Sequence, residues 1–204
     1  IEKDSLIYKE LKLKYNKNKN VEIYNTDFLE FDIEKKLKKN TTVFGNLPYN
    51  ISSQILVKMI KFKAWPPKYN NVIFMFQKEM AERIIGTYNT SKYGRLSILT
   101  NYRLNILKKF NVSSNCFLPK PKVDSSVLFF KPKKKISINI KNIENFEKII
   151  NIFFSNKRKM INKNIKKIFN KDKLDLIKDL DLKSRPSDLK PEKYYEITEL
   201  FEKM

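Results

Sequence analysis

The chain has 204 residues, 41% of them hydrophobic, which is enough for one packed domain with a small extension. Its 43 Lys and Arg residues outnumber its 22 Asp and Glu residues, and the resulting net charge of +21 favours a polyanionic partner such as nucleic acid. The absence of His excludes imidazole catalysis, and the single cysteine, Cys116, excludes an internal disulfide and a multi-cysteine zinc site.

No apolar run approaches the roughly 20 residues that a membrane helix requires, and the first residues lack the features of a signal peptide. We therefore expect a reducing compartment, either the bacterial cytoplasm or an organellar matrix, and neither a membrane nor a metal as partner. The chain begins with Ile1 and not with an initiator Met, so a truncated start is also expected.

The first predicted elements end in acidic side chains. Residues 1–4 predict the end of a strand, and the apolar spacing after them predicts a helix over residues 5–14, which places Glu2 where a strand stops. Residues 21–28 predict a second strand, which ends in the same way with Asp27 beside an aromatic ring. In nucleotide-binding α/β sheets such carboxylates accept hydrogen bonds from ribose or adenine. A solvated charge or a turn former is the alternative for each.

The stretch 43–52, Val-Phe-Gly-Asn-Leu-Pro-Tyr-Asn-Ile-Ser, predicts a strand that ends in a site. Asn46 offers a side-chain carbonyl, and Pro48 can hold the main-chain carbonyl of Leu47 outward. Two fixed acceptors can hold both hydrogens of an exocyclic amine such as N6 of adenine, while its lone pair points at an electrophile. Tyr49 offers a ring for stacking, worth roughly 1 to 3 kcal/mol per base. These residues predict amino-methylation of a base, although the tetrapeptide alone also fits a simple turn.

The following segments alternate between helix and strand. Ser52 and Ser53 are predicted to cap a helix. Residues 71–76 form a nearly continuous apolar run that is typical of a strand buried on both faces, and residues 77–85 predict a helix. This alternation predicts a largely parallel sheet with its sites at the carboxyl ends of the strands. Residues 92–97 fit either an RNA-facing loop or the start of a helix.

Residues 110–112 and 127–130 predict the last two strands, as an antiparallel pair at the sheet edge. Two prolines stiffen the loop between them, and Lys120 and Lys122 in this loop can meet phosphates. Phe117 in the same loop can clamp a flipped base from the side opposite the first aromatic ring, with simple packing as the alternative.

Residues 131–135 form a charged segment that predicts a hinge between two domains, residues 1–135 and residues 136–204. Beyond it, apolar residues at helical spacing predict two or three amphipathic helices, followed by a final helix that opens at residues 185–189.

The cluster at residues 156–159, which includes Arg158, predicts an RNA-facing surface. A solvated face is the alternative, and part of the excess of Lys can also reflect an AT-rich genome.

Seven of these segments together resemble the ribosomal RNA adenine N6,N6-dimethyltransferases. They occur in the family's order and at about its spacing, over nearly the whole chain: residues 1–4, 23–27, 43–52, 76–79, 93–97, 117–125 and 156–159. The resemblance implies an α/β fold with a class I, Rossmann-like methyltransferase sheet, followed by a small all-helical domain. It implies S-adenosylmethionine as the methyl donor and dimethylation of N6 of two adjacent adenines near the 3′ end of small-subunit ribosomal RNA, in ribosome biogenesis. The implied partner is the precursor of the small ribosomal subunit, and we expect a monomer.

The resemblance and the charges together give three sets of site residues. The catalytic set is Asn46, Leu47, Pro48 and Tyr49. The cofactor-binding set is Glu2 for the donor's ribose, Asp27 and Phe28 for its adenine, and Asn46. The set that faces the target base or the RNA is Tyr49, Phe117, Lys120, Lys122 and Arg158.

The chain departs from the family at its start. The glycine-rich loop that follows the family's first strand has no counterpart, since the chain contains three glycines, at 45, 86 and 94. We therefore expect the 204-residue chain to bind the donor poorly and to leave an exposed sheet edge, while the complete gene product is active.

Two other interpretations stay open at this point. One is a large-subunit ribosomal RNA adenine methyltransferase of the macrolide-resistance type, against which Leu47 and Asp124 favour the small-subunit enzymes. The other is a non-catalytic nucleic-acid-binding factor for ribosome assembly or transcription, against which the intact Asn46, Pro48 and Tyr49 argue.

Overall fold

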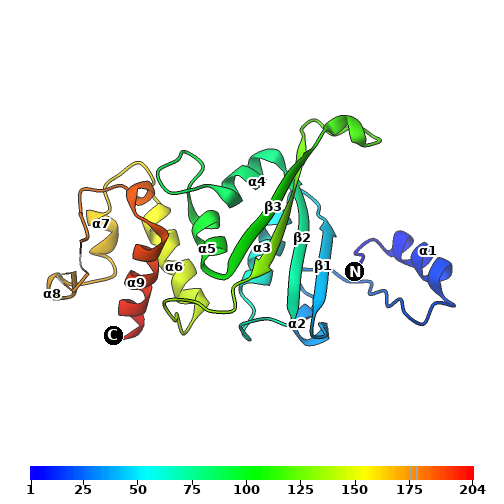
Figure 1. Cartoon of the computed structure of the whole chain (residues 1–204), viewed down its shortest axis with the longest axis horizontal. Helices are drawn as coiled ribbons and strands as arrows, with labels where there is room; N and C mark the ends of the chain where they lie inside the picture. The colour runs from blue at the N-terminus through cyan, green and yellow to red at the C-terminus, as the bar shows by residue number, and fades with distance from the viewer. Residues whose placement is uncertain (175, 178) are drawn as a thin grey trace.

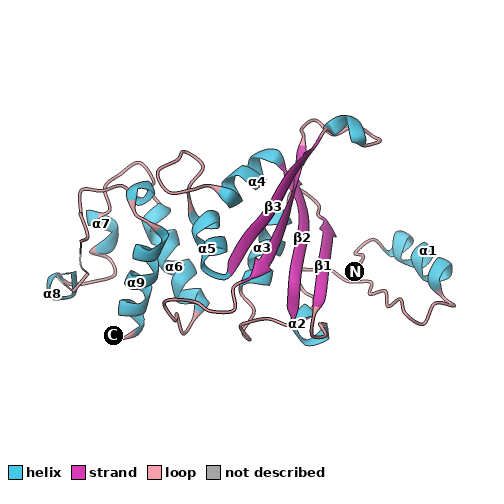
Figure 2. Cartoon of the chain, viewed as in Figure 1, coloured by secondary structure: helices cyan, strands magenta, loops and turns pink. Residues whose placement is uncertain are grey.

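The computed structural model describes residues 1–174, 176, 177 and 179–204. Its centre is a four-stranded sheet in the order β1-β2-β4-β3 (Figure 2). The strands are β1 (Thr41–Asn46), β2 (Tyr69–Gln77), β3 (Leu104–Val112) and β4 (Ser125–Pro132). β1 and β2 are parallel, whereas β4 is antiparallel to β2 and to β3. The predicted antiparallel pair at the edge is confirmed, but the described sheet is mixed and not largely parallel.

The helices of the described residues fall into three groups along the chain (Figure 1). Before and beside β1 lie α1 (Ser5–Tyr15) and α2 (Ile33–Lys36). The layer against the sheet consists of α3 (Ser52–Ile60), α4 (Lys78–Ile85) and α5 (Arg95–Arg103). The C-terminal region holds α6 (Ile143–Phe154), α7 (Asn162–Ile165), α8 (Lys171–Leu174) and α9 (Pro191–Glu202). Two short 3-10 turns are η1 (Ser114–Cys116) and η2 (Pro186–Asp188).

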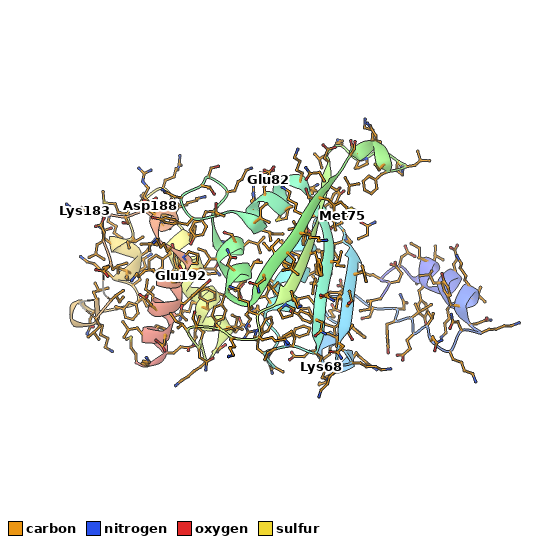
Figure 3. All side chains as sticks on the ribbon, in the orientation of Figure 1. Lys68, Met75, Glu82, Lys183, Asp188 and Glu192 are labelled. Atoms are coloured by element: carbon orange, nitrogen blue, oxygen red, sulfur yellow. The ribbon has the colours of Figure 1, made fainter. Side chains whose placement is uncertain are left out.

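One face of the sheet carries most of the core. On β2, Val72, Phe74 and Phe76 are at most 1% exposed, and they alternate with Ile73 and Met75, which are only partly buried. The prediction that this strand is buried on both faces is therefore wrong. Alternate side chains of a strand point to opposite faces. α4 and α5 contact the sheet, and the Tyr69 hydroxyl on β2 donates to the Met59 carbonyl of α3 at 3.0 Å. Figure 3 labels Met75 on the sheet.

The N-terminal segment does not join this sheet. Residues 21–28 form no strand, and a single parallel bridge links Glu2 with Asn25. The bridge consists of a hydrogen bond from the Glu2 amide to the Tyr24 carbonyl (2.9 Å) and one from the Thr26 amide to the Glu2 carbonyl (3.1 Å). One such pair does not make a ladder, which is why the predicted strand is absent.

β1 lies at an edge of the described sheet, and Phe44 on it is 72% exposed. The expected sheet edge is thus present. The predicted helix over residues 5–14 is confirmed by α1, which lies apart from the sheet beyond β1 in Figure 1 and has no buried residue.

The segment 131–135 is not a free hinge. β4 continues to Pro132, which is buried, and the Lys133 amide donates to the Arg103 carbonyl at 2.8 Å. Trp65 Nε1 in turn donates to the Lys133 carbonyl at 3.0 Å. β3 begins at Leu104, well before the predicted residue 110, because it pairs with β4 over the whole length of that strand.

α6 and α9 pack against α5, and the C-terminal region stands at the opposite end of the molecule from α1 (Figure 1). The labelled residues Lys183, Asp188 and Glu192 of this region mark that end in Figure 3. The ring of Tyr102 on α5 lies 5.1 Å from that of Phe146 on α6, measured between ring centroids. The division into 1–135 and 136–204 stays a prediction.

Of the two or three predicted amphipathic helices, α6 is present with 12 residues, whereas the region after it holds α7 and α8, which have four residues each. The final helix does not open at residues 185–189, because Pro186–Asp188 form η2. α9 starts at Pro191, a residue suited to a first helical turn. No helix in the described part of the chain combines the length and the apolar character that a membrane crossing requires.

Candidate active site

The predicted motif lies at the carboxyl end of β1. Asn46 is the last residue of this strand and is exposed, whereas the side chain of Leu47 turns inward and is only 9% exposed. Among the described residues, the Asn46 side chain has no hydrogen-bond partner. The buried leucine thus anchors the turn to the core, and the asparagine beside it keeps its amide group available for a ligand.

A close approach of side chains explains the glycine before this asparagine. A Cβ atom at Gly45 would lie 2.5 Å from Leu47 Cδ2 and 2.9 Å from Phe74 Cδ1. Both partners are buried and have little room to move. The position of Leu47, and with it that of Asn46, therefore depends on a residue without a side chain at 45.

The hydroxyl of Tyr49 contacts β4, the strand that lies beyond β2 in the sheet. The Tyr49 hydroxyl oxygen lies 2.7 Å from Ser125 Oγ, and Ser125 is fully buried at the start of β4. β4 runs antiparallel to β2, so its first residue pairs with Gln77, at the edge where β1 and β2 end. Ser125 was not among the predicted site residues, although it lies in the segment 117–125 that carries part of the resemblance.

The main chain of Tyr49 is held as well. Ser52 Oγ donates to the Tyr49 carbonyl at 3.1 Å, and α3 begins at Ser52 with Ile51 as its N-cap and no side-chain cap. The predicted capping by Ser52 or Ser53 is therefore wrong. The Ser52 hydroxyl bonds back toward the motif instead of capping the helix.

The two predicted carboxylates come from adjacent segments. Asp27 is partly buried, with Oδ2 2.8 Å from Lys3 Nζ and Oδ1 accepting from the Leu29 amide at 2.8 Å. The hydrogen bonds from Lys3 and Leu29 lower the pKa of the Asp27 carboxyl below its usual value. Glu2 is also partly buried, and its Oε1 accepts from the Asp4 amide at 2.8 Å.

These carboxylates fit a ligand with hydroxyl and amine donors. An ionised carboxylate can accept about four hydrogen bonds. Asp27 accepts from Lys3 and Leu29, and Glu2 accepts from Asp4, so both carboxylates can accept further hydrogen bonds. The ring of Phe28 follows Asp27 and is partly buried, so it can cover a base that bonds to the carboxylate. The residues present therefore suit the adenosine part of S-adenosylmethionine.

The loop between β3 and β4 leaves the sheet beside the motif. Its base is fixed by Asp124, whose Oδ1 accepts from the Ser114 amide at 2.9 Å and whose carbonyl accepts from the Lys78 amide at 2.9 Å. Phe117 is partly exposed, and Lys120 and Lys122 are exposed. The clamping role of Phe117 and the phosphate contacts of the two lysines stay predictions.

Residues 92–97, which fitted either an RNA-facing loop or a helix start, and the cluster 156–159, which was predicted to face RNA, both contribute to packing. Tyr93 is fully buried, and its hydroxyl donates to the Leu189 carbonyl at 3.0 Å, so residues 92–97 lead into α5. Lys157 Nζ donates to the carbonyls of Ser91 (2.9 Å) and Tyr93 (2.8 Å). In the cluster 156–159, Arg158 remains exposed, and its RNA contact stays a prediction.

No group of three or more His, Cys, Asp or Glu side chains among the described residues is arranged to hold a metal ion.

The sequence was compared with known protein families and with curated proteins. The family described as "Ribosomal RNA adenine dimethylase" matches residues 1–203. A protein of Pelagibacter ubique (strain HTCC1062) named ribosomal RNA small subunit methyltransferase A is 39% identical over 203 residues, which cover 99% of this chain and 76% of that protein. Proteins of the same name from Malacoplasma penetrans (strain HF-2) and Francisella tularensis subsp. novicida (strain U112) are 37% and 41% identical. Their matches cover 95% and 75% of this chain and 70% and 58% of those proteins.

Two solved structures share the fold. A dimethyladenosine transferase from Plasmodium falciparum superimposes with a TM-score of 0.77 at 26% identity, over 96% of this chain and 78% of that one. The 23S rRNA methyltransferase ErmE gives a TM-score of 0.65 at 21% identity, over 98% of this chain and 80% of that one. The predicted class I, Rossmann-like methyltransferase fold is therefore confirmed.

Proposed function

Because the chain belongs to the ribosomal RNA adenine dimethylase family, we propose that it transfers methyl groups from S-adenosylmethionine to N6 of two adjacent adenines near the 3′ end of small-subunit ribosomal RNA. The observation that carries this proposal is the exposed Asn46 side chain, unbonded among the described residues, beside a tyrosine ring that Ser125 holds at the same sheet edge. The relatives named as small subunit methyltransferases support the choice of RNA.

The donor side of the site is built from Glu2, Asp27 and Phe28. Glu2 accepts hydrogen bonds from the ribose, Asp27 accepts from the adenine amine, and the ring of Phe28 covers the base. When bound, S-adenosylmethionine supplies a methyl group activated by its positively charged sulfur, so the enzyme needs no nucleophile of its own.

The acceptor side is built from Asn46, Leu47, Pro48 and Tyr49. The Asn46 side-chain oxygen and the Leu47 carbonyl each accept a hydrogen bond from one N–H group of the target amine, which turns its lone pair toward the methyl group. Pro48 keeps the turn from continuing into α3, and Tyr49 stacks on the base. After the first methylation one N–H remains, and either acceptor can hold it for the second transfer.

This arrangement works by positioning and not by acid–base catalysis. The chain has no His, and the site described above contains no nucleophile that an adjacent base would activate. The proton that the amine loses passes to water. A direct transfer without a covalent enzyme intermediate therefore suits these residues.

The proposed partner is the precursor of the small ribosomal subunit, bound by a monomer in the bacterial cytoplasm or an organellar matrix. The net charge of +21 supports a polyanionic partner. Lys120, Lys122 and Arg158 are exposed and suit phosphate contacts, and Phe117 suits the second face of the target base.

The test uses the complete gene product, labelled S-adenosylmethionine and separate unmethylated small and large ribosomal subunits, followed by mass spectrometry of the nucleosides. We expect dimethyladenosine in small-subunit RNA alone. Label in the large subunit would instead support an enzyme of the macrolide-resistance type. RNA binding without methylation of either subunit would support a non-catalytic factor.

Asn46→Ala tests the site itself. We expect this variant to lose turnover and to keep most of its affinity for RNA, because the substitution removes an acceptor for the amine and no phosphate contact. Asn50→Ala, in an exposed asparagine four positions later, is the matched control and should retain activity. Normal turnover in the Asn46 variant would refute the assignment.

A further inference from the structure

Lys58 on α3 has its ammonium group enclosed by main-chain carbonyls. Its Nζ donates to the carbonyls of Phe28 (3.0 Å), Leu29 (2.5 Å) and Phe31 (2.8 Å). An ammonium group has three N–H donors, and these three bonds use all of them. The group also lies 5.7 Å from the centre of the Phe28 ring, so the cation faces the aromatic side chain of the same turn.

The three carbonyls belong to the turn that follows Asp27. This turn is closed by hydrogen bonds from the Glu30 amide (3.1 Å) and the Phe31 amide (3.0 Å) to the Asp27 carbonyl. The Leu29 amide donates to Asp27 Oδ1 at 2.8 Å, which fixes the direction of the carboxylate relative to the turn. Whatever holds the turn therefore also holds the Asp27 carboxylate and the Phe28 ring.

The helix that carries Lys58 begins three residues after Tyr49, the last residue of the proposed acceptor motif, residues 46–49. α3 begins at Ser52, whose hydroxyl bonds to the Tyr49 carbonyl, and Lys58 lies further along this helix. The Asp27 turn is outside the β1–β4 sheet ladder, so its hydrogen bonds to α3 connect it to the part of the molecule that holds Asn46. Lys58 thus links the proposed donor-binding turn to the proposed acceptor-binding turn.

The alternative role for a lysine at this position is a phosphate contact. Lys58 borders a broad groove that Lys61, Lys63 and Arg83 also line, and a free ammonium there would attract RNA. Its three donors, however, are already bonded to carbonyls, and dehydration by burial lowers the pKa of the Lys58 ammonium. A group that is partly dehydrated and fully bonded fits an internal brace better than a phosphate ligand.

We infer that Lys58 is a positioning residue for the methyl donor: its ammonium holds the Asp27–Phe31 turn against α3 and so sets the adenine-binding carboxylate and ring relative to the acceptor motif. This inference rests on the proposed function. It predicts that Lys58 controls affinity for the adenine part of the donor and does not control affinity for RNA.

The test measures calorimetric binding of two product analogues by the complete gene product. One is S-adenosylhomocysteine, and the other is S-inosylhomocysteine, in which a carbonyl replaces the adenine amine that Asp27 would bind. We expect Lys58→Met to weaken S-adenosylhomocysteine by about 10-fold or more, since small displacements of positioning groups have effects of this size. The inosyl analogue lacks the amine that Asp27 would bind and keeps only the ring contact, so its affinity should fall less, and the preference of the wild-type protein for the adenosyl ligand should shrink.

Two further variants separate positioning from general damage. Lys58→Arg keeps the charge and several donors and should restore most of the preference. Lys61→Met makes the same change at the residue that follows α3, a lysine that pairs with Glu144 and Glu147, and should leave both affinities unchanged. In steady-state assays, Lys58→Met should raise the KM for the donor and leave kcat at saturating donor within a few-fold.

An equal loss for both analogues would show a general structural role, and a loss of RNA affinity with unchanged analogue binding would show a phosphate contact; either result overturns the inference. Failure of the wild-type protein to bind S-adenosylhomocysteine at all would refute the proposed function instead.

Discussion

The hydroxyl groups of Tyr49 and Ser125 lie 2.7 Å apart, although 76 positions separate the two residues in the chain. Tyr49 follows β1, Ser125 opens β4, and β2 lies between these strands. The hydrogen bond therefore joins the Tyr49 ring, which follows β1, to the buried Ser125 hydroxyl at the start of β4. Stacking on a base requires a defined ring orientation, and this bond restricts the orientation of Tyr49.

Ser125→Ala should lower kcat by several-fold to about 10-fold, because the ring loses one hydrogen bond worth about 1 kcal/mol. Donor affinity should not change. Ser126→Ala is the matched control, since the neighbouring hydroxyl donates to Asn111 Oδ1 and does not contact the ring. Tyr49→Phe removes the same bond from its other side. The double variant with Ser125→Ala should then be no slower than the slower single variant; additive losses would contradict the coupling.

Gly45→Ala should displace the turn that carries Asn46. The added methyl group would meet Leu47 and Phe74 inside normal contact distance, so the turn that carries Asn46 must shift. We expect a loss of about 1 to 3 kcal/mol in the free energy of unfolding together with reduced turnover. Gly94→Ala is the control, because the nearest atom to its added methyl group is Phe154 Cε1, at an ordinary 3.9 Å. Urea denaturation and methyl-transfer assays of both variants would test this, and equal behaviour would contradict it.

The pH dependence of donor binding should report on Asp27. Its hydrogen bond from Lys3 lowers the pKa of this carboxyl below the usual 3.8, so the ionised form that accepts from adenine persists as the pH falls. Any stability that the ion pair contributes is likewise present above 3.8 and is lost only as the pH falls through the lower folded value. Affinity for S-adenosylhomocysteine should therefore stay constant from neutral pH to the acid limit of folding.

Lys3→Met should raise the pH at which affinity for the donor is lost. Without its partner the pKa of Asp27 returns toward its usual range, so donor affinity should begin to fall at a higher pH than in the wild-type protein. Lys9→Met, an exposed lysine on α1, is the control. Binding titrations between neutral and acid pH, with circular dichroism to follow folding, measure the difference. Superimposable profiles for the wild-type protein and the Lys3 variant would contradict the proposed role of the ion pair.

Arg103→Met should destabilise the protein strongly. The guanidinium is 7% exposed, donates from Nη1 to the carbonyls of Ile60 (2.7 Å) and Phe62 (2.8 Å), and lies over the Trp65 ring at 4.6 Å. Its removal leaves two carbonyls at the end of α3 without a donor. We expect a loss of about 3 kcal/mol in the free energy of unfolding.

Arg95→Met is the matched control for this prediction. Arg95 lies on the same helix, is exposed and bonds to Asn151 alone, so its loss should cost less than about 0.5 kcal/mol. Similar denaturation midpoints for the two variants would show that the buried guanidinium contributes little to stability.

The sequence by itself determined the elements and residues that depend on local chemistry. The strand before Asn46, the helix after it and the antiparallel pair near the end of the sheet follow from short-range periodicity. The availability of Asn46 could also be foreseen, because a proline two residues later restricts the chain there. The single bridge between Glu2 and Asn25 places the two segments that carry Glu2 and Asp27 side by side.

The tertiary structure decided the contacts that join distant segments. Only the order of β1, β2 and β4 brings Ser125 to Tyr49, and only the packing of α3 brings Lys58 to the Asp27 turn. It also turned Lys157 inward, where the sequence predicted an RNA-facing cluster. The physical reason is that periodicity records which face of an element is apolar, whereas a serine or lysine looks the same in sequence whether a distant carbonyl or water binds it.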